Sequence, residues 1–192
     1  LAFAGLAWVW PVSAAEPTAP EWSVVLEESR LGFTAFQSGS PVEGRFDSFE
    51  PHIHFDPQDL TGSRVEVQID MASVNTKSAD RDSTIRSEPL FHVEKYPEAR
   101  FEAGDFRHRG GDEYEADGRL TMRGTTRDIV LPFTLEVAEH PDKEGWKRAT
   151  AKGDIEVDRL DYGIGQGQWQ DTSVVANRVV ISFEIRAERP VE

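Results

Sequence analysis

The sequence predicts an all-β protein in which about eight antiparallel strands surround an apolar interior. The first observation is the repeated alternation of apolar and polar residues, since successive side chains of a strand point to opposite faces. The second is that turn residues separate these segments. The third is that no long amphipathic helix stands between them, which favours antiparallel pairing. Such a sheet either packs on a second sheet or closes into a barrel; closure is favoured because it removes exposed edges.

The clearest signal is a hairpin over residues 118–137, with a turn at Gly124. An isolated hairpin is marginally stable in water, so further strands must cover its apolar face. That face carries Leu120, Met122, Ile129, Leu131, Phe133, Leu135 and Val137.

The segments before this hairpin supply the first strands. Turn clusters rich in Ser, Gly, Asp and Pro separate them, and the most regular alternation runs from Val65 to Met71. The extended segments cover 22–27, 31–36, 42–49, 51–55 and 65–71.

Alternation fails over residues 75–97, where Pro89 and Pro97 punctuate irregularly spaced apolar residues. We expect short helical turns and an ordered loop across one mouth of the barrel. Strand signals then return, and a Gly-rich loop over 161–169 precedes the last strand. The later extended segments cover 99–106, 114–122, 129–137, 146–157 and 179–185.

The start of the chain differs in composition from the rest. Residues 1–15 carry no charge and end in small residues, as the apolar region and cleavage site of a secretory signal do. We interpret them as a truncated signal peptide cut after Ala15, with an uncleaved anchor as the alternative. Residues 16–21 then form a flexible leader and 22–188 a single domain, which is periplasmic or secreted.

The net charge of −14 argues against a nucleic-acid partner, because binding phosphates requires clustered Lys and Arg. Anionic membrane surfaces are disfavoured for the same reason.

Small residues recur at the inward positions, which raises the question of whether the barrel is filled or hollow. Small groups facing one another either bring the walls close or leave space for a guest, and an eight-stranded barrel can do either. The glycines could instead mark bends and bulges of a filled core. The small inward residues are Ala35, Gly44, Ala103, Ala116, Gly118, Ala149, Ala151 and Gly153.

Short motifs occur in a fixed order over residues 22–187. They are Ser29-x-Leu31-x-Phe33, Val42-x-Gly44-x-Phe46-x-x-Phe49, Phe55-Asp56-Pro57, Ile69-Asp70 to Thr76, Arg81-Asp82, Phe91-x-Val93, Tyr96-Pro97-x-Ala99-x-Phe101, Gly118-x-Leu120-Thr121-Met122-x-Gly124-Thr125-Thr126 and Arg159-x-Asp161-Tyr162-Gly163. In this order the motifs resemble the YceI-like family of polyisoprenoid-binding, lipocalin-like proteins. Leu90-Phe91 departs from the two aromatics often found there.

The resemblance implies an extended eight-stranded lipocalin-like barrel that holds a long-chain isoprenoid lipid, of polyprenyl or quinone type, without catalysis or a cofactor. Residues 163–169 resemble a subgroup associated with membrane b-type cytochromes, which suggests such a partner; a homodimer stays open. The expected ligand-binding residues are Phe33, Ala35, Phe46, Phe49, Val67, Ile69, Met71, Phe91, Phe101, Leu120, Met122, Leu131, Phe133, Ile155, Trp169, Ile181 and Phe183.

Other patterns suggest different chemistry. His52 and His54 share one strand face and could hold a metal for a periplasmic hydrolase, although no third ligand has a diagnostic spacing. The glycines of 163–167 lack the helix and Lys of a nucleotide-binding loop. Trp169 is either a lid over the cavity or a residue packed beside the core.

Overall fold

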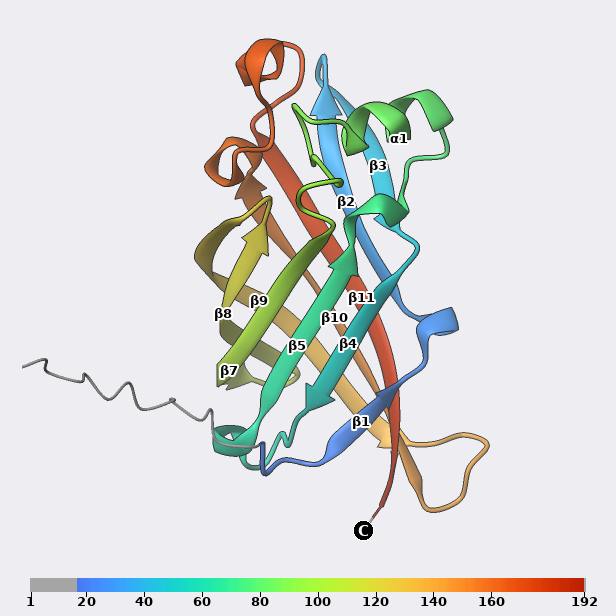
Figure 1. The fold of residues 1–192 in the computed structure, drawn as a ribbon. Helices are drawn as coiled ribbons and strands as arrows, with labels where there is room; N and C mark the ends of the chain where they lie inside the picture. Colours follow the sequence, from blue (N-terminus) through green and yellow to red (C-terminus); the bar gives the residue numbers. More distant parts are fainter. Residues whose placement is uncertain (1–16, 192) are drawn as a thin grey trace, which may run out of the picture.

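A computed structural model describes residues 17–191, which form an elongated antiparallel β-barrel with one short α-helix (Figure 1). The helix is α1 (Ala79–Arg86). The strands are β1 (Glu21–Val24), β2 (Arg30–Gln37), β3 (Ser40–Phe46), β4 (Phe49–His54), β5 (Arg64–Asp70), β6 (Val74–Asn75), β7 (Glu98–Gly110), β8 (Glu113–Met122), β9 (Thr125–Glu139), β10 (Trp146–Asp158) and β11 (Arg178–Pro190).

The eleven strands of residues 17–191 form the eight staves of the barrel, because three staves are each bent and divided into two strands. β1 continues into β2 after the 3₁₀ turn Leu26–Glu28, β3 into β4 through a two-residue corner, and β5 into β6 through the 3₁₀ turn Met71–Ser73. β1 pairs with β4 on one side and with β11 on the other, which closes the sheet. The predicted eight-stranded antiparallel barrel is therefore confirmed.

Ser29 keeps the bent β1–β2 stave attached to β11. Before the bend, the Val25 N–H donates to the Arg186 carbonyl (2.8 Å). After it, the Ser29 hydroxyl accepts the Arg186 N–H (3.0 Å) and donates to the Val25 carbonyl (2.8 Å). The side chain thus replaces ladder partners that the 3₁₀ turn removes, and the wall bends without leaving these polar groups unpaired.

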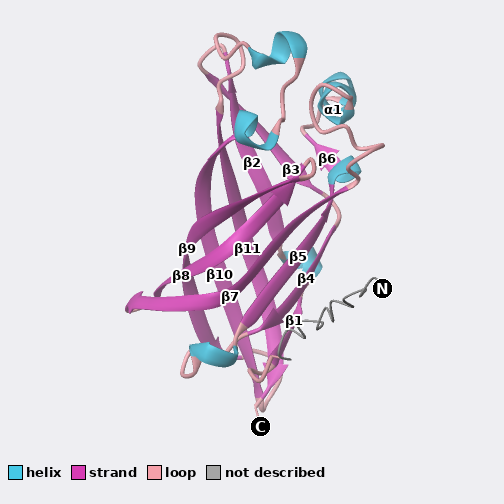
Figure 2. Cartoon of the chain, turned by 60° about the vertical axis from the view of Figure 1, so that its left-hand side comes forward, coloured by secondary structure: helices cyan, strands magenta, loops and turns pink. Residues whose placement is uncertain are grey.

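Residues 76–97 and 159–177 lie at the same end of the barrel, which Figures 1 and 2 show on the side of α1. Ser78 caps α1 by accepting the N–H of Arg81. The Pro89 carbonyl accepts the N–H groups of Gly165 (3.0 Å) and Gln166 (2.8 Å), so the two segments are joined. A short helix and an ordered loop across this mouth agree with the expectation for residues 75–97.

The opposite end holds the start of the described chain. The Ala19 N–H donates to the Gly62 carbonyl (3.2 Å), and the Phe55 N–H donates to the Pro20 carbonyl (3.1 Å). From Ala19 onward the leader expected over 16–21 is therefore hydrogen-bonded to the barrel, because Pro20 extends the β1–β4 pairing and Ala19 pairs with Gly62. The signal peptide expected over 1–15 lies outside the described residues. Within those described, none of the helices is long and apolar enough to cross a bilayer.

Buried apolar side chains gather in two clusters, one toward each end of the barrel. The cluster toward α1 comprises Ile69, Met71, Leu90, Ala99, Leu120, Met122, Val157, Tyr162 and Ile164. The cluster toward β1 comprises Trp22, Phe55, Tyr114, Ala149 and Ala187. The inward faces of the strands between these clusters bound the candidate site.

Candidate functional site

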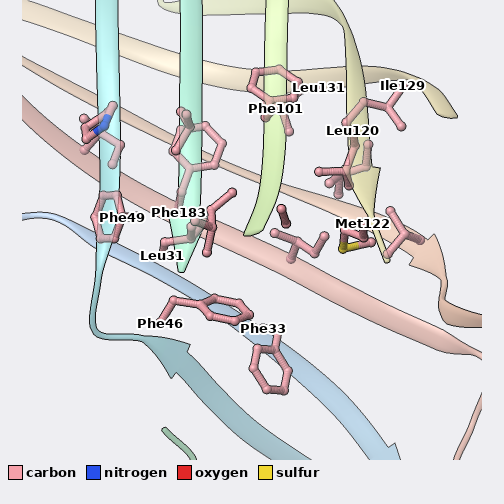
Figure 3. A pocket seen from close by; sticks show the side chains of 18 of the residues that line it. Leu31, Phe33, Phe46, Phe49, Phe101, Leu120, Met122, Ile129, Leu131 and Phe183 are labelled. Atoms are coloured by element: carbon pink, nitrogen blue, oxygen red, sulfur yellow. The ribbon is translucent and has the colours of Figure 1, made fainter. Parts of the chain in front are cut away.

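The barrel encloses a cavity of about 310 Å³, at the lower end of the ~300–1,000 Å³ typical of small-molecule sites. Its accessible surface is apolar throughout. Figure 3 shows side chains from facing walls directed into this space, among them Leu31, Phe49, Leu131 and Phe183. The cavity arises because each strand presents alternate residues inward, so a long run of alternation becomes a continuous apolar wall.

Sixteen of the seventeen residues expected to bind a ligand line this cavity. Trp169 does not; it lies in the 3₁₀ turn Gly167–Gln170 and packs against the cluster toward α1, which is the second of its two expected positions. The sixteen residues are Phe33, Ala35, Phe46, Phe49, Val67, Ile69, Met71, Phe91, Phe101, Leu120, Met122, Leu131, Phe133, Ile155, Ile181 and Phe183.

The cavity is also lined by residues that the sequence analysis did not predict, and these are of two kinds. Leu31, Ile53 and Ile185 occupy inward positions of alternating strands, so the pattern itself could have identified them. Ile164 and Val175 lie outside the named strands and become wall residues only because the 159–177 segment folds over the barrel end. No sequence signal distinguishes this second kind.

The inward glycines do not leave open space, which corrects part of the sequence interpretation. A Cβ added at Gly44 would lie 2.6 Å from Phe33 Cε1, one at Gly118 2.6 Å from Phe101 Cε2, and one at Gly153 2.8 Å from Phe183 Cε1. Each ring therefore occupies the place of the missing side chain. The glycines let large rings lie flat on the wall, whereas alanines such as Ala116 and Ala151 border the cavity directly.

Arg159 is the charged residue among those lining the cavity, and it is 4% exposed. Its Nε donates to the Ala176 carbonyl (3.0 Å), Nη1 to the Ile164 carbonyl (2.9 Å) and Nη2 to the Val175 carbonyl (2.9 Å). Burial lowers the pKa of the guanidinium from its usual value. The head of Arg159 thus fastens the end segment, and its accessible contribution to the cavity is apolar.

The two histidines considered for a metal lie on the outer face of β4. Pro51 and Ile53 line the cavity, so His52 and His54 alternate outward. His52 Nε2 lies 3.3 Å from a Glu50 oxygen, and His54 Nδ1 contacts the Ala19 carbonyl at 3.2 Å. Across residues 17–191 no group of three metal-binding side chains comes together. The geometry gives the hydrolase hypothesis no support.

A buried histidine–glutamate pair lies near the opposite end, between the β9–β10 loop and β11. His140 Nε2 is 2.8 Å from Glu188 Oε1, while His140 Nδ1 accepts the N–H groups of Asp142 (3.0 Å) and Lys143 (2.9 Å). Both ring nitrogens are therefore engaged in holding the β9–β10 loop against β11.

A sequence model of the YceI-like domain matches residues 22–187. The chain belongs to the YceI-like family. Among relatives of this YceI-like chain, a UPF0312 protein of Vibrio cholerae is 31% identical over 142 residues, covering 74% of this chain and 71% of the relative. A UPF0312 protein of Photorhabdus laumondii is 35% identical over 135 residues, covering 69% of each.

Solved structures share the fold of this YceI-like chain. The crystal structure of Burkholderia cenocepacia BcnA superposes with a TM-score of 0.78 at 27% identity, covering 86% of this chain and 99% of BcnA. A structure described as a polyisoprenoid binding domain from Saccharophagus degradans, implicated in plant cell wall breakdown, gives a TM-score of 0.67 at 17% identity. It covers 88% of this chain and 98% of the domain, a likeness of fold.

Proposed function

We propose that this chain is a non-enzymatic binding and carrier protein for a long-chain isoprenoid lipid, of polyprenyl or quinone type. One observation carries the proposal: the cavity is lined by side chains of both buried clusters and is apolar over its whole accessible surface. A polar substrate would find no hydrogen-bond partner there, so its desolvation would oppose binding. An isoprenoid tail needs none. The polyisoprenoid-binding description of the Saccharophagus degradans domain is consistent with this ligand class.

The hydrophobic effect alone gives a useful affinity. Burying one methylene contributes ~0.8 kcal/mol, so ten enclosed carbons contribute ~8 kcal/mol before the costs of ordering. A net binding free energy of that size corresponds to a dissociation constant of roughly a micromolar, and the ordering costs are offset by each further carbon that the cavity buries. The polar head group remains at the mouth near α1 and the 163–169 loop, outside the apolar space.

Native mass spectrometry of the protein purified gently from its own host tests the proposal. We expect a bound lipid of isoprenoid mass, identified after extraction. An empty protein that also fails to bind an isoprenoid alcohol in titration contradicts it.

The cellular setting belongs to the same proposal. The uncharged residues 1–15 support export to the periplasm or beyond, which sequencing the N-terminus of the purified protein checks. A membrane b-type cytochrome as recipient of a quinone cargo rests on the resemblance of 163–169 and is tested by co-purification. Gel filtration tests the homodimer.

A further inference from the structure

Phe33 of β2 and Gly44 of β3 are paired directly across the two strands, and the ring of Phe33 covers the glycine. A Cβ at position 44 would lie 2.6 Å from Cε1 and 2.9 Å from Cε2 of this ring. Real Cβ atoms do not approach other atoms so closely, so the ring occupies a notch that exists because residue 44 has no side chain. The ring therefore lies against the wall rather than across the cavity.

The notch at Gly44 differs from those at the other two ring-covered glycines. At Gly118 a Cβ would also meet the Glu102 carbonyl oxygen at 2.7 Å, and at Gly153 the Pro132 carbonyl oxygen stands in the way. At Gly44 the three nearest atoms all belong to the far end of the Phe33 side chain. An added methyl group can therefore be accommodated by turning one ring, without moving the backbone.

The surroundings of Phe33 also differ from those of the other rings near this wall. Phe33 is not among the residues packed on either buried cluster of the described chain, whereas Phe46 and Phe91 are packed on the cluster toward α1. Its ring meets Phe46 at 5.7 Å between centroids with a 46° tilt, and Phe46 stacks on Phe91 at 6.2 Å. Figure 3 shows Phe33 beside Phe46 at the edge of the labelled side chains. The ring thus rests between the Gly44 notch and Phe46.

We propose that Phe33, seated in the notch of Gly44, determines which tail cross-section the cavity accepts. With the ring flat on β3, the cavity is wide enough at this wall for a methyl-branched chain. With the ring displaced, the same wall admits only a slimmer, unbranched chain. This inference rests on the proposed function and adds the residue pair that selects the branched class of tail.

The test uses two alcohols, hexahydrofarnesol and dodecanol, which share the hydroxyl group and main-chain length and differ only in methyl branches. Affinities are measured by displacement of a fluorescent probe from wild type, Gly44→Ala, Phe33→Ala and the double variant. Wild type binds the branched alcohol more tightly, because its extra methyl groups are buried. We expect Gly44→Ala to lower the affinity for the branched alcohol about tenfold or more, and the affinity for dodecanol by less than about threefold.

The double variant separates ring displacement from any other effect of the new methyl group. Without the ring, adding Ala at 44 has nothing to displace, so the double variant and Phe33→Ala bind hexahydrofarnesol within about threefold of each other. The matched control is Gly104→Ala on β7, where an added Cβ meets no atom within 4 Å; it leaves both affinities unchanged. Circular dichroism and thermal unfolding verify that each variant is folded.

Equal weakening of both alcohols by Gly44→Ala overturns the inference, as does a loss that persists in the double variant. If Gly44→Ala does not fold, Phe33→Ala decides: removing the ring must shift the preference further toward the branched alcohol, and an unchanged ratio overturns the inference. Wild type that binds neither alcohol refutes the proposed function itself. Wild type that binds both, with Gly44→Ala unaltered, refutes only the role of Phe33.

Discussion

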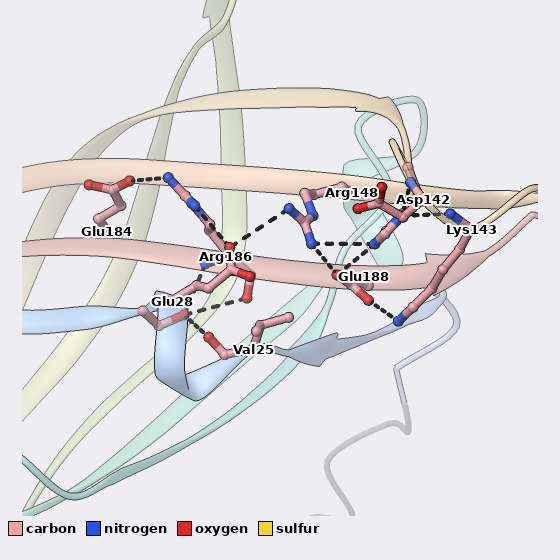
Figure 4. Close-up of polar contacts among 10 residues, drawn as sticks. Val25, Glu28, Asp142, Lys143, Arg148, Glu184, Arg186 and Glu188 are labelled. Carbon is pink, nitrogen blue, oxygen red and sulfur yellow. Dashed lines mark hydrogen bonds and ion pairs between the residues drawn. The ribbon is translucent and has the colours of Figure 1, made fainter.

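The buried carboxylate of Glu188 makes the stability of the barrel depend on pH. Figure 4 shows this carboxylate between Lys143 and Arg148. Its side chain is 9% exposed, and hydrogen bonds from Lys143 (2.5 Å), Arg148 (2.7 Å) and His140 (2.8 Å) lower its pKa from 4.5 to about 2. All three donors favour the ionised carboxylate. Their contribution to the stability of the folded state is therefore present only while Glu188 is charged.

Glu188→Gln removes the charge and keeps the shape. A pKa lowered from 4.5 to about 2 corresponds to stabilisation on the order of 3 kcal/mol. Because the folded-state pKa is the lower one, this stabilisation is complete above the unfolded-state value of 4.5 and is lost as pH falls toward 2. The free-energy difference between wild type and Glu188→Gln should therefore be about 3 kcal/mol at neutral pH and should shrink as the pH approaches 2.

Urea unfolding followed by tryptophan fluorescence, at a series of pH values from neutral to about 3, measures this difference. The other carboxyl groups titrate in both proteins, so their contributions cancel in the difference between the two unfolding free energies. Glu184→Gln on the same strand is the control, since Glu184 is 33% exposed and its pairs with Lys152 and Arg186 lie at the surface; we expect less than about 1 kcal/mol. A wild-type advantage over Glu188→Gln that is the same at every pH would refute the reasoning.

Three further substitutions test how the ends and bends of the barrel are held. Arg159→Met leaves three main-chain carbonyls without their donor, so we expect about 2–4 kcal/mol lower stability and faster amide exchange over 160–177. Ser29→Ala removes the hydroxyl that pairs with Arg186, at a cost of about 1–3 kcal/mol in urea unfolding. Gly153→Ala forces a methyl group toward the Phe183 ring and lowers stability by about 1–3 kcal/mol in thermal unfolding.

Each of these substitutions has a matched control. Arg159→Lys keeps the charge but not the three-way donor geometry, so amide exchange over 160–177 should still be faster; protection equal to wild type would contradict the role of the hydrogen bonds. Ser40→Ala changes an exposed serine and should cost little, so an equal loss would contradict the bridging role of Ser29. Gly104→Ala should be close to neutral, and a loss matching that of Gly153→Ala would contradict the steric cause.

The strands could be predicted because one physical rule governs them. In β9, Ile129, Leu131, Phe133 and Leu135 all line the cavity, as the alternation requires when one face is apolar and the other wet. The same alternation predicted most of the residues that line the candidate site. Closure could also be argued, since exposed edges are disfavoured.

The bends and the barrel end could not be predicted, because they depend on contacts between distant residues. Ser29 looks like any serine in the sequence, and only its pairing with Arg186 across 157 positions shows that it completes the β11 ladder. Arg159 likewise joins Ile164 to Val175 and Ala176 through main-chain carbonyls, which carry no sequence signal. The alternation predicted which side chains face inward but not where those side chains lie once inside.

The positions of the aromatic side chains inside the barrel explain why it encloses a cavity instead of being filled. The chain has eleven phenylalanines, and nine of them line the interior. Part of the aromatic bulk is concentrated toward β1, where Phe55 meets Phe106 at 5.2 Å and Tyr114 at 5.9 Å between ring centroids, in edge contacts that pack that end. Three further rings lie in the notches of Gly44, Gly118 and Gly153 and thicken the wall. A methyl group at Gly44 would push the Phe33 ring inward, and at Gly118 or Gly153 it would meet a ring and a main-chain carbonyl oxygen together. The open volume therefore depends on these glycines as well as on the apolar residues.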